Sequence, residues 1–306
     1  MTKVLIATEK PFSKTAIDEV KKSIEQADFQ IDLLEKYAEK SALLTAVKDA
    51  DALIVRSDKI DQEVFDAADN LKIVVRAGAG YDNVDLAAAT SKGVVVMNTP
   101  GQNSNAVAEL AIGMMIFLNR NKYTPKAGVE LRGKKIGIHA YGYVGRIVAR
   151  IANGLGMKVY AYDPFVDKVI IENDGVNCLS SAEELYSTCQ YISLHIPSND
   201  QTRNSINEAL LSSMPEGATL VNTARKEVID EQGLLKAMAD RDDLRYLSDI
   251  APDIKDELVE KYSDRVFFTP KKMGAQTAEA NLNAGVAAVK QIVAFITNGD
   301  ETFKVN

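Results

Sequence analysis

Two adjacent lysines, Lys271 and Lys272, follow a strand-like run in FFTPKKMGAQT, and they are the first candidates for acid–base chemistry. A lysine side chain has a pKa of about 10.4 in water, which must fall to roughly 7–8 before the amine can accept a proton near neutrality. That change of about three units corresponds to roughly 4 kcal/mol; cationic neighbours favour it and a close carboxylate opposes it. The alternative interpretation is a pair of solvated charges in a surface turn.

A second chemical pattern is the segment KKIGIHAYGYVGRIVARIANGLGMKVYAYD, which predicts a strand, a tight turn, a helix and another strand. A dinucleotide-binding turn has the pattern GxGxxG, and its three positions here hold Ala140, Gly142 and Gly145. Alanine suits the first position only if its φ angle stays negative, so the fingerprint is weakened there. The helix beginning near Gly142 would direct free N–H groups at a pyrophosphate. Asp163, at the end of the next strand, would accept ribose hydroxyls and repel a 2′-phosphate, which favours NAD over NADP.

A third candidate is the loop formed by Gly78, Ala79 and Gly80, which follows the run KIVVR. Side chains this small leave the backbone N–H groups bare, and such groups can receive a carboxylate. An ordinary turn is the alternative interpretation of the same residues.

The elements that must position these residues alternate between short β-branched runs and amphipathic helical patterns. The runs of a first series are KVLIAT, FQIDLL, DALIVR, KIVVRAG and GVVVMN, and those of a second are KKIGIHA, KVYAYD, YISLHIP, TLVNTA, RYLSDI and VFFTP. Such alternation implies parallel strands with crossover helices, in two open α/β units joined near residue 98. The pattern AVAELAIGMMIFLNR predicts a long helix with Ser104 or Asn105 as its cap. The last helical pattern, EANLNAGVAAVKQIVAFITNG, adds no strand to the second series.

Composition and charge narrow the class of protein. The 306 residues, 46% of them hydrophobic, have a net charge of −7, which argues against nucleic acid as the main partner. No run approaches the roughly 18 apolar residues of a membrane span, and MTKVLIATEK reads as an opening strand rather than a signal peptide. Cys178 and Cys189 lack metal-ligand spacing and are expected to be reduced thiols. We therefore expect a cytoplasmic protein with no membrane partner and no metal.

Three further segments carry a resemblance to a known family: VVRAGAGYDNVDLAAATSKGVVVMNTPGQNSNAVAEL, LVNTARKEVIDEQGLLKAM and FTPKKMGAQT. Together they resemble the D-2-hydroxyacid dehydrogenases, and among them the 3-phosphoglycerate dehydrogenases, over essentially the whole chain. The resemblance implies two open parallel-sheet domains, a Rossmann-type dinucleotide-binding domain inserted into a flavodoxin-like substrate domain. It implies a substrate domain at residues 1–98, an NAD-binding domain at 99–281 and a returning C-terminal helix at 282–306. It also implies a homodimer formed through the NAD-binding domain, without the serine-binding regulatory domain of longer members.

The same resemblance assigns roles to individual residues. Arg225 matches the catalytic arginine that grips the substrate carboxylate, a task that suits a planar, permanently charged guanidinium. Arg56 and Arg76 match positions that contact the substrate and are candidates for its phosphate, with Lys10 as a further candidate. The implied substrate-binding residues are Arg56, Arg76, Gly78, Gly80 and Arg225. The implied cofactor-binding residues are Ala79, Gly142, Tyr143, Val144, Gly145, Asp163, Ile196, Pro197, Thr223, Ala224, Asp249 and Gly274, with Asp249 holding the nicotinamide amide.

The catalytic histidine of the family is missing from the motif TPKKMGAQT. Counting from TP places Lys271 at the histidine's position, and counting back from GAQT places Lys272 there. The family's orienting glutamate falls on Ile254, so Asp253 is at most a modest orienter of the lysine that replaces the histidine. His139 and His195 are rival bases, although the family also has a histidine without a catalytic role at the second position. Our hypothesis is that Lys271 or Lys272 is the acid/base.

The sequence therefore predicts an enzyme that oxidises the 2-hydroxyl of 3-phosphoglycerate by hydride transfer to NAD, the first step of serine biosynthesis. One alternative is the same chemistry on an unphosphorylated 2-hydroxy acid. The other is a non-catalytic protein that senses NAD(H), which the absence of the histidine favours and the presence of Arg225 opposes.

Overall fold

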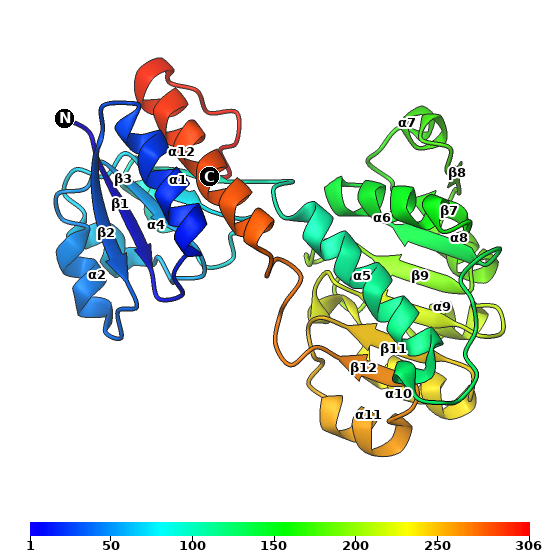
Figure 1. Ribbon diagram of the computed structural model, residues 1–306. Coiled ribbons are helices and arrows are strands. Elements are labelled where there is room, and N and C mark those ends of the chain that lie inside the picture. Colours follow the sequence, from blue (N-terminus) through cyan, green and yellow to red (C-terminus); the bar gives the residue numbers. More distant parts are fainter. The chain divides into compact units, whose positions relative to one another are not determined.

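The computed structural model describes all 306 residues, which form two compact units (Figure 1). The first unit contains Met1–Asn103 and Gln276–Asn306, and the second contains Ser104–Ala275. The chain leaves the first unit once and returns to it with its last helix, so the second unit is an insertion in the first.

The first unit is built on a parallel five-stranded sheet in the order β2-β1-β3-β4-β5. Its strands are β1 (Lys3–Thr8), β2 (Gln30–Glu35), β3 (Ala52–Val55), β4 (Ile73–Arg76) and β5 (Val95–Asn98). Its helices are α1 (Lys14–Glu25), α2 (Lys40–Ala46), α3 (Gln62–Ala67), α4 (Leu86–Ser91) and α12 (Ala278–Asn298). This strand order is that of a flavodoxin-like sheet, as predicted.

Helix α12 is long and apolar enough to cross a membrane by length and composition, but it packs as a core helix of the first unit. It lies beside α1, as Figure 1 shows in orange-red and blue. Its Ala284, Ala288 and Ile292 share a hydrophobic cluster with Val20 of α1. The helix ends at Gly299, whose left-handed φ of 69° suits the residue that follows a helix.

The second unit is built on a parallel seven-stranded sheet in the order β12-β11-β10-β9-β6-β7-β8. Its strands are β6 (Lys135–His139), β7 (Lys158–Tyr162), β8 (Asn177–Cys178), β9 (Tyr191–Leu194), β10 (Thr219–Asn222), β11 (Arg245–Ser248) and β12 (Val266–Phe268). Its helices are α5 (Ser104–Asn119), η1 (Asn121–Tyr123), α6 (Tyr143–Gly154), α7 (Lys168–Asn173), α8 (Ala182–Thr188), α9 (Glu208–Ser213), η2 (Lys226–Val228), α10 (Glu231–Asp240) and α11 (Lys255–Tyr262). The order reverses between β6 and β9, as in a Rossmann fold.

Both faces of the larger sheet are buried, because its strands are apolar on both sides. Along β10, Leu220 packs into a cluster with residues of α8, α9 and α10, whereas the next residue, Val221, packs into a cluster with residues of α5 and α6. The predicted fold class, two open parallel sheets with a Rossmann-type insertion, is confirmed. The two-residue strand β8 was not predicted, and the expected cap at Ser104 or Asn105 is wrong because α5 begins at Ser104 itself.

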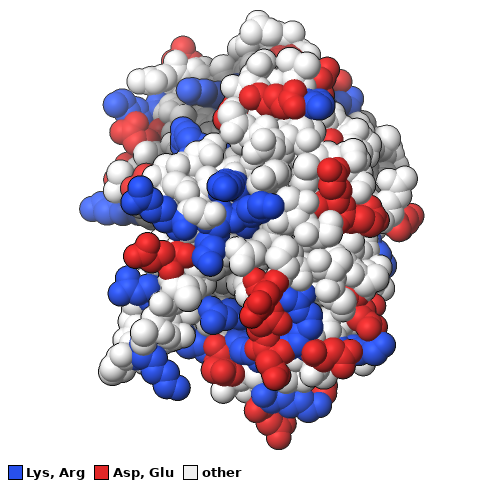
Figure 2. All heavy atoms as spheres, turned by 90° about the vertical axis from the view of Figure 1, so that its right-hand side faces the viewer, with Lys and Arg blue, Asp and Glu red and all other residues white.

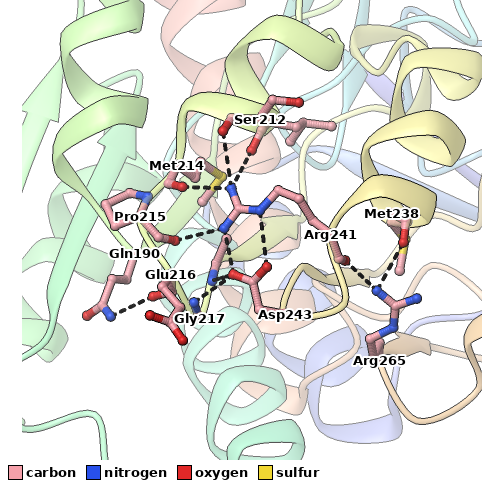
Figure 3. A network of polar contacts seen from close by, with 12 residues as sticks. Gln190, Ser212, Met214, Pro215, Glu216, Gly217, Met238, Arg241, Asp243 and Arg265 are labelled. Carbon is pink, nitrogen blue, oxygen red and sulfur yellow. Dashed lines mark hydrogen bonds and ion pairs between the residues drawn. The ribbon is translucent and has the colours of Figure 1, made fainter.

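Arg241 and Asp243 form a hydrogen-bonded pair, which we call the arginine clamp, at the amino-terminal ends of strands of the larger sheet (Figure 3). The guanidinium of Arg241 donates to the carbonyls of Met214 and Pro215 and forms two bonds with the Asp243 carboxylate. Asp243 also accepts from Gly217 N, at 2.8 Å. The clamp joins the turn before β10 to the turn before β11, at the edge opposite to the carboxyl ends of the strands.

Candidate active site

The predicted cofactor and catalytic residues of the second unit follow the carboxyl ends of successive strands of its sheet. Read across the sheet from β7 to β12, these positions are Asp163 after β7, Gly142–Gly145 after β6, Ile196 and Pro197 after β9, Thr223–Arg225 after β10, Asp249 after β11, and Lys271–Gly274 after β12. Because the strands are parallel, all of these residues lie at one edge of the sheet, on both sides of the point where the strand order reverses. Open α/β sheets bind ligands at such a point.

The turn after β6 is packed as closely as a dinucleotide-binding turn, but its first residue, Ala140, has a strained backbone conformation. A Cβ atom on Gly145 would lie 2.3 Å from the carbonyl oxygen of Ala140, so only glycine allows this helix–turn contact. Gly142 precedes α6 and offers no side-chain cap, which leaves the first N–H groups of the helix available to an anion. Ala140 has a φ angle of 78°, so the condition under which alanine would suit this position, a negative φ, is not met. The position is a left-handed one that glycine fills without strain.

Asp163 is held by backbone bonds at the end of β7. Its Oδ2 accepts from Tyr141 N at 2.7 Å, and its Oδ1 accepts from Phe165 N at 2.8 Å. These bonds fix the carboxylate beside the turn after β6 and use one lone pair of each oxygen. The remaining lone pairs can accept hydroxyl groups, as the predicted ribose contact requires. Tyr143 is mostly exposed at the start of α6, whereas Val144 packs against the hydrophobic cluster beneath the helix.

The turn that carries Arg225 is locked by the buried side chain of Asn222. Asn222 accepts from Ala224 N and donates to the Arg225 carbonyl, both at 2.9 Å, and Arg225 Nη1 donates to the Ala224 carbonyl at 2.9 Å. The buried Thr223 Oγ1 has no hydrogen-bond partner within the protein. A buried hydroxyl without a partner is uncommon, and a bound ligand would satisfy it.

These features fit a nicotinamide dinucleotide. The uncapped start of α6 suits a pyrophosphate, Asp163 suits a ribose with a free 2′-hydroxyl, and Thr223 supplies a hydroxyl further along the same edge. The residues that would hold the group are therefore Gly142, Gly145, Asp163 and Thr223.

Asp249 is buried, with 1% of its surface exposed, and its carboxylate binds the loop that carries the two lysines. Its Oδ1 accepts from Thr269 Oγ1 at 2.8 Å and from Met273 N at 2.7 Å, and its Oδ2 accepts from Gly274 N at 2.8 Å. Its own N–H donates to the Asn222 carbonyl. The residue predicted to hold the nicotinamide amide is thus already engaged within the protein by three donors.

Lys271 and Lys272 lie at the exposed top of this loop. Asp253, the predicted orienter, is not directed at either of them by any described bond: its Oδ1 lies 2.5 Å from Lys226 Nζ, and its side chain is 76% exposed. Lys226 follows Arg225 directly, and Asp253 raises the pKa of Lys226 through this bond. The interpretation of Asp253 as an orienter of a catalytic lysine is corrected accordingly.

The two histidines are poor candidates for an acid/base near neutrality. Burial lowers the pKa of His139 to about 4, and its Nδ1 lies 3.3 Å from Tyr186 Oη. Burial and the nearby His139 also lower the pKa of His195, whose Nε2 lies 3.0 Å from Ser193 Oγ. Both rings are neutral at pH 7 and engaged in the sheet, so neither replaces the missing histidine of the family.

In the first unit, Arg56 holds the backbone of the neighbouring strand end. Its Nη1 donates to the carbonyls of Lys10 at 2.9 Å and Pro11 at 3.0 Å, its Nη2 donates to Asn281 Oδ1, and its guanidinium lies over the Phe12 ring. Burial lowers the pKa of Arg56 from its usual value. Three of its five donors are therefore used internally, and a phosphate contact, which stays a prediction, would have to use the other two.

The loop after β4 brings Arg76 and Gly78 into contact. Gly78 has a φ of 149°, and a Cβ atom on it would lie 1.5 Å from Arg76 Nη1. Gly78 N donates to the Arg76 carbonyl, at 2.8 Å. The expectation that all three N–H groups of the loop are bare is therefore wrong, and only those of Ala79 and Gly80 remain for an anion. Arg76 Nε donates to the Arg56 carbonyl at 2.9 Å, which joins the two predicted substrate arginines.

Several residues that organise these groups were missed from the sequence. Asp58, buried in the first unit, accepts from Glu9 N and from Tyr37 Oη, both at 2.7 Å, and from Arg56 N. Asn222 and Thr269 have corresponding roles in the second unit. Their common signal is a polar side chain at or just after the end of a strand, where a parallel sheet places its ligand site.

A parallel sheet with a glycine-containing turn at the point where its strand order reverses is the arrangement of a dinucleotide-binding protein. The sequence pattern of the D-isomer specific 2-hydroxyacid dehydrogenase family, catalytic domain, matches residues 5–306. The chain therefore belongs to this family. This family assignment, together with the NAD+-bound relative described next, supports the class and the cofactor predicted from the sequence, an NAD-dependent oxidoreductase.

Individual relatives agree with this assignment. The chain is similar to the crystal structure of NAD+-bound 3-phosphoglycerate dehydrogenase from Entamoeba histolytica, with 46% identity, a TM-score of 0.91, and coverage of 100% of this chain and 98% of the other. It is 36% identical to D-3-phosphoglycerate dehydrogenase of Methanocaldococcus jannaschii, over 83% of this chain and 51% of that protein. It is 35% identical to hydroxypyruvate reductase of Thermotoga maritima, over 86% of this chain and 90% of that protein.

The match thus spans about half the length of several of the curated phosphoglycerate dehydrogenases, but nearly all of the Entamoeba structure and of the Thermotoga reductase.

Proposed function

We propose that this protein catalyses the NAD-dependent oxidation of 3-phospho-D-glycerate to 3-phosphohydroxypyruvate, the entry to serine biosynthesis. The observation that carries the proposal is the 46% identity, over the whole chain, to a solved 3-phosphoglycerate dehydrogenase with bound NAD+. The line of site residues along the carboxyl edge of the larger sheet supports the same reaction class.

The proposed chemistry needs one fixed cation and one proton acceptor. A bound NAD+ would supply the acceptor for the hydride that leaves C2 of the substrate. Arg225 binds the substrate carboxylate and polarises the 2-oxygen, since a guanidinium can form two parallel bonds to a carboxylate. The amine of Lys271 or Lys272 takes the hydroxyl proton as the C2–O bond becomes a double bond. In the reverse direction, the same ammonium returns the proton to the oxygen.

The locked turn at Asn222 supports the role of Arg225. Two side-chain bonds from Asn222, to Ala224 N and the Arg225 carbonyl, fix the backbone on both sides of the arginine's Cα. Because its backbone is fixed, the guanidinium loses less conformational entropy when it binds the substrate carboxylate, which favours this role for Arg225.

The lysine as acid/base is consistent with the displacement of Asp253. A carboxylate close to a lysine stabilises its cation and raises its pKa, which would weaken it as a base near neutrality. Asp253 instead pairs with Lys226, at 2.5 Å. The Asp253 carboxylate is therefore engaged by Lys226 and not by Lys271.

The second candidate is the same reaction on an unphosphorylated 2-hydroxy acid. The observation that favours it is the similarity to hydroxypyruvate reductase from Thermotoga maritima, which covers 90% of that protein. The internal use of three Arg56 donors also weakens the argument for a phosphate site at this residue.

The proposal includes a homodimer formed through the second unit and a cytoplasmic location, with no nucleic-acid or membrane partner. Its support is a surface hollow of about 450 Å³ beyond α5, lined by Arg120, Tyr123 and the segment 124–128. Tyr123 is 68% exposed there, so its ring is accessible to a second copy of the chain. On the face shown in Figure 2, a group of Lys and Arg side chains lies at the left centre and groups of Asp and Glu lie below it and to the right, so no single basic surface covers this face.

The test compares NADH oxidation with 3-phosphohydroxypyruvate and with hydroxypyruvate at equal concentrations. The proposal expects a kcat/KM at least about 100-fold higher for the phosphorylated acid, since a charged phosphate contact is worth roughly 3 kcal/mol. Equal values, or a preference for hydroxypyruvate, would select the second candidate. NADH binding without turnover of either acid would indicate a non-catalytic NAD(H)-binding protein.

A further inference from the structure

We propose that Asp249 is a positioning residue for the acid/base lysine, acting through the loop Thr269–Gly274, which we call the lysine loop. The proposal rests on the proposed function, because it deepens the role of the same site. The bonds it rests on lie inside the protein and use three of the four lone pairs of the carboxylate, which leaves one for the predicted contact with the nicotinamide amide.

The geometry shows a carboxylate that binds both ends of one loop. At the start of the lysine loop, Thr269 Oγ1 donates to Asp249 Oδ1 at 2.8 Å. At its end, Met273 N donates to Oδ1 at 2.7 Å and Gly274 N donates to Oδ2 at 2.8 Å. The two lysines lie between these anchors, at the exposed top of the loop.

Burial makes these bonds strong. Asp249 is 1% exposed and Thr269 is 5% exposed, so water cannot replace the donors that Asp249 receives. A buried carboxylate is tolerated only where hydrogen bonds stabilise its charge, and each bond to a charged group is stronger than one between neutral groups. Loss of one donor would therefore leave the carboxylate underbonded. Loss of the carboxylate would release the Met273–Gly274 end of the loop and leave Thr269 held only by its bonds to the backbone carbonyls of Ser248 and Asp249.

The end of the loop is closely packed at Gly274. A Cβ atom on Gly274 would lie 3.0 Å from Asp249 Oδ2 and 3.2 Å from a methyl group of Val107 in α5. Asp249 is itself fixed, because its N–H donates to the Asn222 carbonyl and Asn222 also holds the turn of Arg225. One continuous set of hydrogen bonds therefore links the turn of Arg225, which is predicted to bind the substrate carboxylate, to the loop that carries the predicted acid/base.

Two separate functions follow for the residues at this edge of the sheet, one for the lysine and one for Asp249. Catalysis by a lysine requires its amine to stay within bonding distance of the substrate oxygen, and a loop anchored at one end only would lose that geometry. Asp249 keeps the backbone of the loop in place while the flexible lysine side chain moves the proton. Neither function needs Asp249 to touch the cofactor.

Asp249→Asn and Thr269→Val test the proposal from the two sides of the same bond. Asparagine keeps the size of the aspartate but must present its NH₂ group to at least one of the loop's donors. Valine keeps the shape of threonine and removes only the hydroxyl. Asp264→Asn is the matched control, because it removes an exposed carboxylate from the turn before β12, outside the lysine loop.

The first readout is limited trypsin digestion without substrate, with cleavage after Lys271 and Lys272 followed by mass spectrometry. We expect cleavage there to be about tenfold or more faster in Asp249→Asn and several-fold faster in Thr269→Val, because loss of an anchoring bond increases local opening. Asp264→Asn should match the wild type. The expectation holds whether or not the protein turns over 3-phosphohydroxypyruvate, so a failure of the proposed function would not hide a failure of this proposal.

The second readout separates the loop role from a cofactor role. We expect kcat to fall about 10- to 100-fold in Asp249→Asn, while the NADH Kd measured by nucleotide fluorescence stays within about twofold. Thr269→Val should lower kcat less, the double variant should lose less than the product of the single losses, and Thr269→Ser should recover most of the rate.

Two results would overturn the proposal. One is an NADH Kd weakened about tenfold or more in Asp249→Asn with unchanged cleavage of the loop, which would assign the carboxylate to the nicotinamide. The other is wild-type cleavage in both Asp249→Asn and Thr269→Val, which would show that these bonds do not hold the loop. If Asp249→Asn fails to fold, the cleavage and kcat of Thr269→Val decide alone.

Discussion

Asp253 forms an ion pair with Lys226, with 2.5 Å between Oδ1 and Nζ, and so belongs to the turn that follows Arg225 and not to the lysine loop. The side chain of Asp253 is largely exposed, and exposed pairs contribute little to stability. Asp253→Asn should therefore change kcat by less than about twofold and leave the pH dependence of kcat unchanged. Steady-state rates from about pH 6 to 10 check this, and a shifted pH profile would restore Asp253 as an orienter.

The lysine hypothesis is tested by Lys271→Ala and Lys272→Ala. We expect one of the two variants to lose about 100-fold or more in kcat with NADH binding unchanged, since general acid–base catalysis contributes about 10²- to 10⁴-fold. The other variant should retain most of its rate and serves as the matched control, because it removes the same charge from the same loop.

The pH profile adds an independent check on the lysines. His139 and His195 are neutral at pH 7, so neither should contribute an ionisation near neutrality to the pH dependence of the rate. His139→Gln should therefore leave this pH dependence unchanged. If both lysine variants keep wild-type rates, the pair is surface charge and the proton moves through another group.

Much of the site was predictable because its residues come directly after strands. The β-branched runs identified every strand except β8, and parallel pairing then places the residues after each run at one edge of the sheet. Asp163 was located in this way, whereas Thr223 and Arg225 were assigned through the family resemblance and follow β10 at the same edge. Their positions depend only on local pattern and strand direction, which the sequence carries.

The features that the sequence could not predict depend on contacts between distant segments or on backbone angles. The bond from Arg56 to Asn281 joins residues 225 positions apart, so the internal use of that arginine has no local signal. The role of Asp249 requires β11 to pair with β12, which brings Met273 and Gly274 to its carboxylate. Alanine rarely adopts a left-handed conformation, so the residue type gave no signal for the positive φ of Ala140.

Ala140 offers a prediction of unusual sign. A non-glycine residue in the left-handed region costs roughly 1–2 kcal/mol, whereas glycine loses more chain entropy on folding, by roughly 0.5–1 kcal/mol. Ala140→Gly should therefore raise the free energy of unfolding by up to about 1 kcal/mol. The same substitution at the exposed Ala87 in α4 should lower it by roughly 0.5–1 kcal/mol. Urea unfolding of both variants checks the contrast, and destabilisation by Ala140→Gly would contradict the strain.

The contact between Gly78 and Arg76 predicts a selective loss of substrate binding. An alanine at residue 78 would place its Cβ 1.5 Å from Arg76 Nη1, so the guanidinium must move. We expect Gly78→Ala to raise the KM for the phosphorylated acid about tenfold or more, and to change the NADH Kd by less than about threefold. Gly93→Ala is the matched control, because Gly93 also has a positive φ, of 69°, but has open space around its Cβ position. Equal effects of the two variants would reduce the role of Gly78 to backbone strain.

Acid stability should depend on the clamp between Arg241 and Asp243. The Arg241 guanidinium lowers the pKa of Asp243 to about 2, helped by the bond from Gly217 N. The unfolded-state pKa of an aspartate is about 3.9, so the contribution of the clamp is complete above about pH 4 and is lost as the pH falls toward about 2. With 30% of the Asp243 side chain exposed, solvent screening limits this contribution to about 1–2 kcal/mol. Asp243→Asn should therefore lose that stability at pH 7 and show a shallower decline between about pH 4 and 2 than the wild type, as measured by urea unfolding at each pH. Asp264→Asn, which lacks the clamp's bonds, should follow the wild-type curve, and a wild-type decline in Asp243→Asn would show that other carboxylates govern acid unfolding.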